Sequence, residues 1–146
     1  MILNTYSHSS SGQSLVEVVV TVAIATLILV ALVAGATVAV RNIQYSRNRA
    51  RAVALNRQAT EWLRSERAKG WSAFYSRLAE GNYCLNTLDL SRHRNCNSNE
   101  LVDGVFKREA NVAKEGLDKI IITVTTFWTD SQGEHREEVK TYLTRW

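Results

Sequence analysis

The chain has 146 residues, which is room for one domain with an appendage and too little for several domains. Its formal net charge of +4 is modest, with 18 Lys and Arg against 14 Asp and Glu. The part that follows Gly70, about 75 residues, can bury only a small core, so we expect it to need a staple such as a disulfide.

An apolar segment is the first predicted element. A polar, serine-rich leader ends at Gly12, and no charged side chain occurs from Val18 to Val40. A helix of about 20 apolar residues is long enough to cross a bilayer, so this run predicts a membrane-spanning segment. The alternative is a cleaved secretory signal with its site at residues 34–36. Such a signal has a shorter apolar region and a basic start, which this leader lacks.

The apolar segment continues into a second helical pattern. Ser14 and Glu17 match the capping box S-x-x-E, which predicts a helix start at residues 13–15. No proline occurs in the chain, and the next glycine after Gly35 is Gly70. Apolar residues recur at helical spacing beyond the membrane run: Ala52, Leu55, Ala59, Trp62 and Leu63. We therefore predict one helix over residues 14–69, apolar all round in its first half and with one apolar stripe in its second.

A short helical turn and three strands are predicted after Gly70. The turn covers residues 71–78 and would pack back on the stripe. A polar loop that contains both cysteines follows, and strands are predicted at 105–112, 120–128 and 137–146. Residues 130–133 have turn chemistry. Together these elements predict an α+β fold, in which a small antiparallel sheet packs on the second half of the helix.

Two tryptophans of these strands admit two interpretations. Trp128 and Trp146 are predicted to pack on the sheet face against the helix, and a partner-binding surface is the alternative. Trp128 would share its face with Ile120, Ile122 and Val124, because successive strand residues point to opposite sides.

The start of the chain resembles that of type IV pilins and pseudopilins. The residues that carry the resemblance are the polar leader ending in Gly12, the sequence GQSLVE with its glutamate at position 17, and the unbroken apolar helix. The closing TVTTFWTDSQGEH and TYLTRW resemble the last hairpin of minor pilins. The resemblance implies a pilin-like fold with a leader at 1–12, a membrane and assembly half of the helix at 13–40, an amphipathic half at 41–70 and a globular head at 71–146.

The same resemblance implies how the chain is processed and assembled. A prepilin peptidase would cut between Gly12 and Gln13 and methylate the new amine, and Glu17 would pair with the amine of a neighbouring subunit. The partners implied are other pilin subunits, this peptidase and the inner-membrane assembly platform. The precursor would lie in the cytoplasmic membrane and the mature subunit in an extracellular filament. The simpler readings are a linker glycine at Gly12 and an interfacial cap at Glu17.

Small residues on the apolar helix form a candidate contact ridge. Ala31, Gly35 and Ala39 recur every four residues, and small residues let membrane helices approach closely. We expect this ridge to contribute to assembly with neighbouring subunits.

The cysteines, Cys84 and Cys96, allow three interpretations. A disulfide is expected if this part of the chain is exported, since exported proteins retain such bridges. Free thiols are the second interpretation. The third is half a metal site with His93, but three ligands at this spacing match no zinc motif, so no metal is expected.

Residues 91–95, SRHRN, form a basic loop between the cysteines. Arg92 and Arg94 are expected to be exposed, and a solvated polar loop is the simpler interpretation. The alternative is a contact with DNA or another anionic partner, which would show a steep dependence on salt.

No catalytic constellation or cofactor motif is recognisable in the sequence, so we expect neither an enzyme nor a bound cofactor. The function predicted is a minor subunit of a type IV pilus. The alternatives are a pseudopilin of a type II secretion or DNA-uptake system, and a membrane-anchored binding module that does not polymerise.

Overall fold

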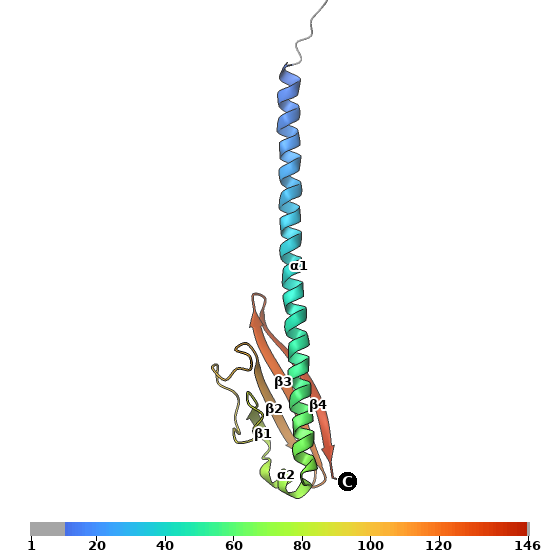
Figure 1. Cartoon of the computed structure of the whole chain (residues 1–146), viewed down its shortest axis with the longest axis vertical. Helices are drawn as coiled ribbons and strands as arrows, with labels where there is room; N and C mark the ends of the chain where they lie inside the picture. Colours follow the sequence, from blue (N-terminus) through green and yellow to red (C-terminus); the bar gives the residue numbers. More distant parts are fainter. Residues whose placement is uncertain (1–10, 146) are drawn as a thin grey trace, which may run out of the picture. The chain divides into compact units, whose positions relative to one another are not determined.

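The structure, a computed structural model, describes residues 11–145, with side chains from Leu15 onwards. Figure 1 shows the elements in chain order: α1 (Ser11–Ala68), α2 (Trp71–Arg77), β1 (Gly81–Cys84), β2 (Lys107–Lys114), β3 (Lys119–Asp130) and β4 (Gly133–Thr144). The chain divides into two compact units between Ile43 and Gln44. The first unit contains the N-terminal part of α1, and the second, here called the head, contains the rest of α1, α2 and the sheet.

Helix α1 confirms the single long helix but begins earlier than predicted. It starts at Ser11, so the backbone of Ser14 lies inside the helix and the predicted cap at Ser14 is wrong for this chain. The helix ends at Ala68, where the backbone N–H of Gly70 donates to the carbonyl of Arg67 at 3.2 Å. The φ of 153° at Gly70 is one that side chains rarely permit, which explains why the helix stops here.

The sheet is an antiparallel meander with the order β1-β2-β3-β4. Asp130 pairs with Gly133, so Ser131 and Gln132 form the predicted turn between the last two strands. Strand β2 lies two residues later than predicted, and β4 begins at Gly133 instead of residue 137. The alternation of apolar and polar residues is weak at both of these ends, so it could not fix them.

Strand β1 was missed, because its four residues GNYC were assigned to the polar loop. Glycine and asparagine are poor strand formers, and the strand exists through its pairing with β2. Gly81 is required at its start. Its φ is 120°, and a Cβ there would lie 3.0 Å from Nε2 of His93.

The core of the head forms where the stripe of α1 meets the sheet. Ala59 and Leu63 are fully buried, together with Phe74 and Leu78 from α2 and its end. The sheet contributes one face of its strands to this cluster: Ala110, Val112, Ile120, Ile122, Val124 and Leu143. These contacts confirm both the predicted stripe and the predicted packing of the short helical turn.

Trp128 packs in a second cluster with Ala52, Leu55 and Phe106, and only 2% of its surface is exposed. The packing interpretation of this tryptophan is therefore confirmed. Trp146 lies outside the described residues.

Two buried polar side chains tie α1 to the sheet. Asn56 is fully buried, donates from Nδ2 to the carbonyl of Glu137 at 2.8 Å and accepts from Oγ1 of Thr126 at 2.7 Å. From the other side, Arg108 donates from Nη1 to the carbonyl of Leu55 at 3.0 Å. The same guanidinium donates to Oε1 of Gln58 at 3.0 Å and to the carbonyl of Leu85 at 2.9 Å. Burial lowers the pKa of Arg108.

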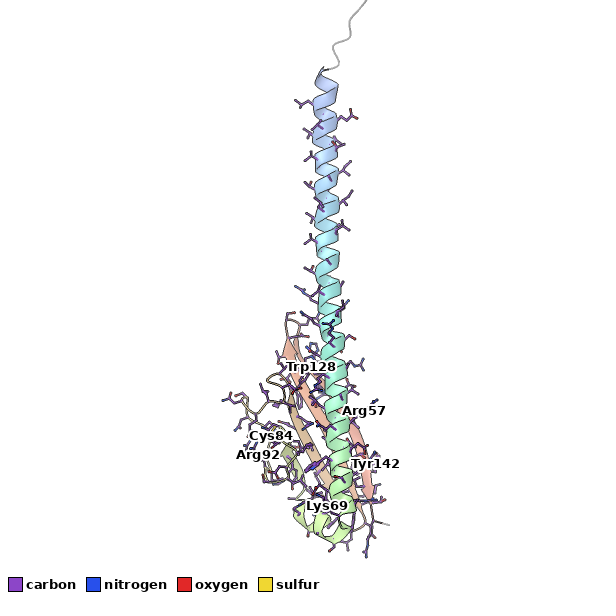
Figure 2. All side chains as sticks on the ribbon, viewed as in Figure 1. Arg57, Lys69, Cys84, Arg92, Trp128 and Tyr142 are labelled. Atoms are coloured by element: carbon purple, nitrogen blue, oxygen red, sulfur yellow. A yellow bond between two sulfur atoms is a disulfide. The ribbon has the colours of Figure 1, made fainter. Side chains whose placement is uncertain are left out.

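We expect Arg108→Met to lower the free energy of unfolding by about 2 kcal/mol, because buried carbonyls of the helix and of the loop after β1 lose their donor. Arg57→Met is the matched control, since Arg57 is exposed on α1 (Figure 2) and its loss should cost less than about 0.5 kcal/mol. Urea unfolding of the full chain in detergent, followed by tryptophan fluorescence, measures both. Equal effects of the two changes would contradict a role for the buried guanidinium.

Candidate functional site

The apolar surface of α1 is the first candidate site. Every side chain from Leu15 to Val40 is exposed among the described residues, so this part of the helix is apolar on all sides. The helix is long and apolar enough to cross a membrane, and none of its apolar window is buried inside the structure. A surface of this kind is stable only in lipid or against other apolar helices.

The threonine hydroxyl groups on this surface form hydrogen bonds within their own helix. Thr21 donates to the carbonyl of Glu17 at 2.8 Å, Thr26 to that of Ala23 at 2.8 Å and Thr37 to that of Ala34 at 2.7 Å. Hydroxyl groups that bond to the backbone one turn earlier need no partner from outside the helix.

Glu17 is the one charged side chain near the start of the apolar surface. It is exposed, and it has no ion-pair partner among the described residues. A carboxylate placed in an apolar medium needs a cation or donors, so a partner for Glu17 would have to come from another group.

The predicted ridge lies along one side of α1. Ala31, Gly35 and Ala39 are all helical and exposed, and their spacing places them above one another. A Cβ at Gly35 would meet nothing within 4 Å, so no packing within this chain requires a glycine there. The ridge stays a prediction for contact with a second helix.

The predicted processing site lies at the beginning of α1. Gly12 and Gln13 belong to its first turn, and the side chain of Gln13 lies outside the described ones. Cleavage and methylation at this site stay predictions.

The two cysteines form a disulfide in the head. The sulfur atoms of Cys84 and Cys96 are bonded, and both residues are buried. Of the three interpretations, the structure therefore has the disulfide, and no free cysteine is found. His93 does not turn toward the sulfur atoms, because its Nε2 lies 2.9 Å from the carbonyl of Glu80. Closing a loop of this length contributes about 3 kcal/mol to stability.

The two arginines of the basic loop share one carboxylate. Arg94 forms two hydrogen bonds of 2.7 Å to the two oxygens of Glu100, and Arg92 lies 3.3 Å from Oε1 of the same group. Glu100 also accepts from the backbone N–H of Asn97 at 2.8 Å. Asp89 lies just before this loop and accepts from the loop's first backbone N–H at 3.1 Å, so the two arginines are balanced by two carboxylates. Both arginine side chains stay partly exposed, so a contact with an anionic partner stays a prediction.

Glu100 is the residue beside this loop whose contacts the sequence analysis missed. The hydrogen bonds from Arg94, followed by that from the backbone of Asn97, lower its pKa from 4.5 to about 2. The signal in the sequence was a single acidic residue close to a basic loop, but nothing in its spacing indicated that both arginines would converge on it.

Comparison with known proteins finds no match to this chain among protein-family models, curated proteins or solved structures. The class of protein is therefore argued from the fold. A long N-terminal apolar helix, a four-stranded antiparallel sheet on its second half and a disulfide in the head are compatible with a pilin-like protein.

The low pKa of Glu100 predicts how the stability of the head depends on pH. A carboxylate whose pKa falls on folding stabilises the folded state at pH values above its pKa in the unfolded chain. This contribution is lost as the pH falls toward its pKa in the folded state. The relevant window runs from about 4.5 down to about 2. We expect Glu100→Gln to lower the free energy of unfolding at neutral pH, and the difference from the unchanged chain to vanish near pH 2.

Urea unfolding at a series of pH values measures this difference, and Glu138→Gln is the control. Glu138 is exposed and has no ion pair among the described residues, so its change should leave the pH profile as it is. A constant difference for Glu100→Gln across the whole window would show that the ion pairs do not matter.

Proposed function

We propose that the chain is a minor pilin of a type IV pilus, cleaved after Gly12 and assembled into a filament through α1. The observation that carries the proposal is the surface of α1 from Leu15 to Val40. It is apolar on every side and has one unpartnered carboxylate, Glu17, near its start. The fold supports the same class, because the second half of the helix is covered by a small antiparallel sheet.

Glu17 is the residue that makes assembly specific in this proposal. Cleavage after Gly12 creates a positively charged amine on Gln13, close in sequence to the carboxylate. Within one helix the amine of Gln13 and the carboxylate of Glu17 are too close along the chain for an ideal ion pair. An adjacent copy that is shifted along the axis can bring its amine to Glu17. A buried charge that finds a counter-charge is stabilised, and one without it is strongly disfavoured. The pair therefore fixes the axial register of neighbouring subunits.

The apolar surface supplies the area for this assembly. The ridge of Ala31, Gly35 and Ala39 lets a second helix approach closely. Contacts between different surfaces of identical subunits do not close on themselves, so they build a helical filament. Each subunit then displays its head on the outside of the filament, where many copies can act together.

Processing and partners follow from the same scheme. The precursor is held in the cytoplasmic membrane by α1, is cut and methylated by a prepilin peptidase, and is handed to the assembly platform in that membrane. The mature subunit then lies outside the cell. The role proposed is structural and not enzymatic.

We expect the mature protein to begin at Gln13, with a methylated or cyclised terminus. Mass spectrometry of material sheared from the cell surface checks this. Surface material that retains Met1 would contradict the proposal and favour a membrane-anchored binding module. A cleaved protein that never leaves the cell envelope would favour a pseudopilin.

We expect Glu17→Leu to reduce the amount of this subunit in sheared filaments roughly a hundredfold, because the amine of the next subunit loses its buried partner. Cleavage should proceed as before. The control is Glu61→Leu, which changes an exposed carboxylate on the second half of the same helix. Immunoblots of the membrane and sheared fractions measure both variants. Normal incorporation of the Glu17 variant would refute the role of this carboxylate.

A further inference from the structure

The head has two different ends, set by the antiparallel strands. Strand β2 starts at Lys107 and runs to Lys114, a turn at residues 115–118 follows, and β3 returns to Asp130. The turn therefore lies at one end of the sheet, and Phe127 lies at the other, about 30 Å away along the strand. In Figure 1 the β3–β4 hairpin and α2 mark these opposite ends.

An apolar hollow lies at the hairpin end. It has a volume of about 460 Å³ and lies between the loop before β2 and the ends of β3 and β4. Leu101 and Val105 line it with 37% and 47% of their surfaces exposed, and Phe127 lines it from β3. Leu101, Val105 and Phe127 give the hollow an apolar part beside the polar Ser98 and Thr129, and this part can seat an apolar side chain from outside.

An apolar knob lies at the opposite end. Leu117, in the turn between β2 and β3, is 75% exposed, the highest value among the exposed large apolar residues described. Its turn is held in place by two aromatic side chains of α2. Trp71 donates from Nε1 to the carbonyl of Leu117 at 3.1 Å, and the hydroxyl of Tyr75 donates to the carbonyl of Gly116 at 3.0 Å. A side chain on a turn held in this way is presented in a fixed position.

Charged residues flank both features, one of each sign. Lys107 and Glu134 line the hollow. Asp118 and Arg145 flank the knob, with 72% and 65% of their side chains exposed and a loose separation of 3.7 Å. Glu134 has no ion-pair partner in the part of the chain that the structure describes. Nζ of Lys107 lies 4.0 Å from Oε1 of Glu109 and 4.8 Å from the centre of the Phe127 ring. When the two ends face each other, Arg145 can meet Glu134, and Asp118 can approach Lys107 beside Glu109.

We propose that heads bind end to end, with Leu117 of one copy seated in the hollow formed by Leu101, Val105 and Phe127 of the next. The occupant is a second copy of this chain, because the knob, the hollow and the two charge pairs are all supplied by the same head. Copies joined in this way point in the same direction, as subunits of one filament do. The inference rests on the proposed function and adds a contact between heads to the contact between helices.

The two surfaces lie at opposite ends of the head, so the contact is head to tail and does not close into a dimer. This distinguishes it from a symmetric interface, in which a residue near the axis meets its own copy.

Cross-linking between two marked copies tests the contact. One copy carries Leu117→Cys, the other carries Val105→Cys, and both are full-length chains expressed in the same cells. A short bismaleimide applied to sheared filaments should link the mixed pair into a dimer. Neither variant expressed alone should give this product. Linkage of Leu117→Cys to itself would overturn the head-to-tail arrangement.

Exchange of the flanking charges is the second test. Glu134→Arg alone and Arg145→Glu alone should each lower the cross-linking yield at least several-fold, and the double change should restore it. Glu138→Arg is the control for added charge, because Glu138 lies on β4 away from both ends. Formation of the disulfide between Cys84 and Cys96 reports that each variant is folded.

The outcomes separate this inference from the proposed function. If sheared filaments contain the cleaved chain but the mixed pair is not linked, the end-to-end contact is wrong and the pilin assignment stands. If the chain stays uncleaved in the membrane, the pilin assignment itself is wrong. Linkage that is insensitive to both charge exchanges would refute the proposed pairing of Arg145 with Glu134.

Discussion

The need to cover an apolar helix surface is the constraint on which the rest of this structure depends. Burial of apolar surface is the main favourable term in folding and in association, and it has no preferred direction. In the head, the sheet covers one stripe of α1, including the fully buried Ala59 and Leu63. From Leu15 to Val40 nothing in the described chain covers the helix. The same helix therefore completes a core in one part and requires an outside partner, lipid or protein, in the other.

Apolar packing alone would not fix how the helix sits on the sheet. Two buried polar groups supply the missing direction: Asn56 bonds to β3 and β4, and Arg108 reaches from β2 to the carbonyl of Leu55. Rotation or sliding of the helix would leave these buried groups without partners, at a cost of about 1–3 kcal/mol each. Arg108 also bonds to Leu85, which directly follows Cys84, so the disulfide loop, the sheet and the helix are linked through one guanidinium.

Much of this fold could be predicted from the sequence because two periodicities are strong. The stripe from Ala52 to Leu63 repeats at helical spacing, and β3 is β-branched or aromatic at every position from Ile120 to Trp128, with burial that alternates along that stretch. Both elements were therefore located correctly. Strand β1 has too few residues for a period, and it depends on pairing with a segment far along the chain. The convergence of Arg92 and Arg94 on Glu100 and the burial of Arg108 depend on tertiary contacts in the same way. No local pattern encodes them. The disulfide was predictable from the even number of cysteines and the expected export of the head, not from geometry.

The distribution of polar groups along α1 explains how an apolar surface can still be specific. Thr21, Thr26 and Thr37 donate to carbonyls of their own helix, so they need no hydrogen-bond partner from a neighbouring helix. Among the described side chains from Leu15 to Val40, this leaves Glu17 as the polar one whose side chain forms neither a hydrogen bond nor an ion pair. In the proposed assembly, apolar contacts are nearly equivalent at many axial positions, so the position at which Glu17 would meet a cation is the one that differs in energy. A helix with several unsatisfied polar groups would have several competing registers. With a single one, the register follows from where the counter-charge lies.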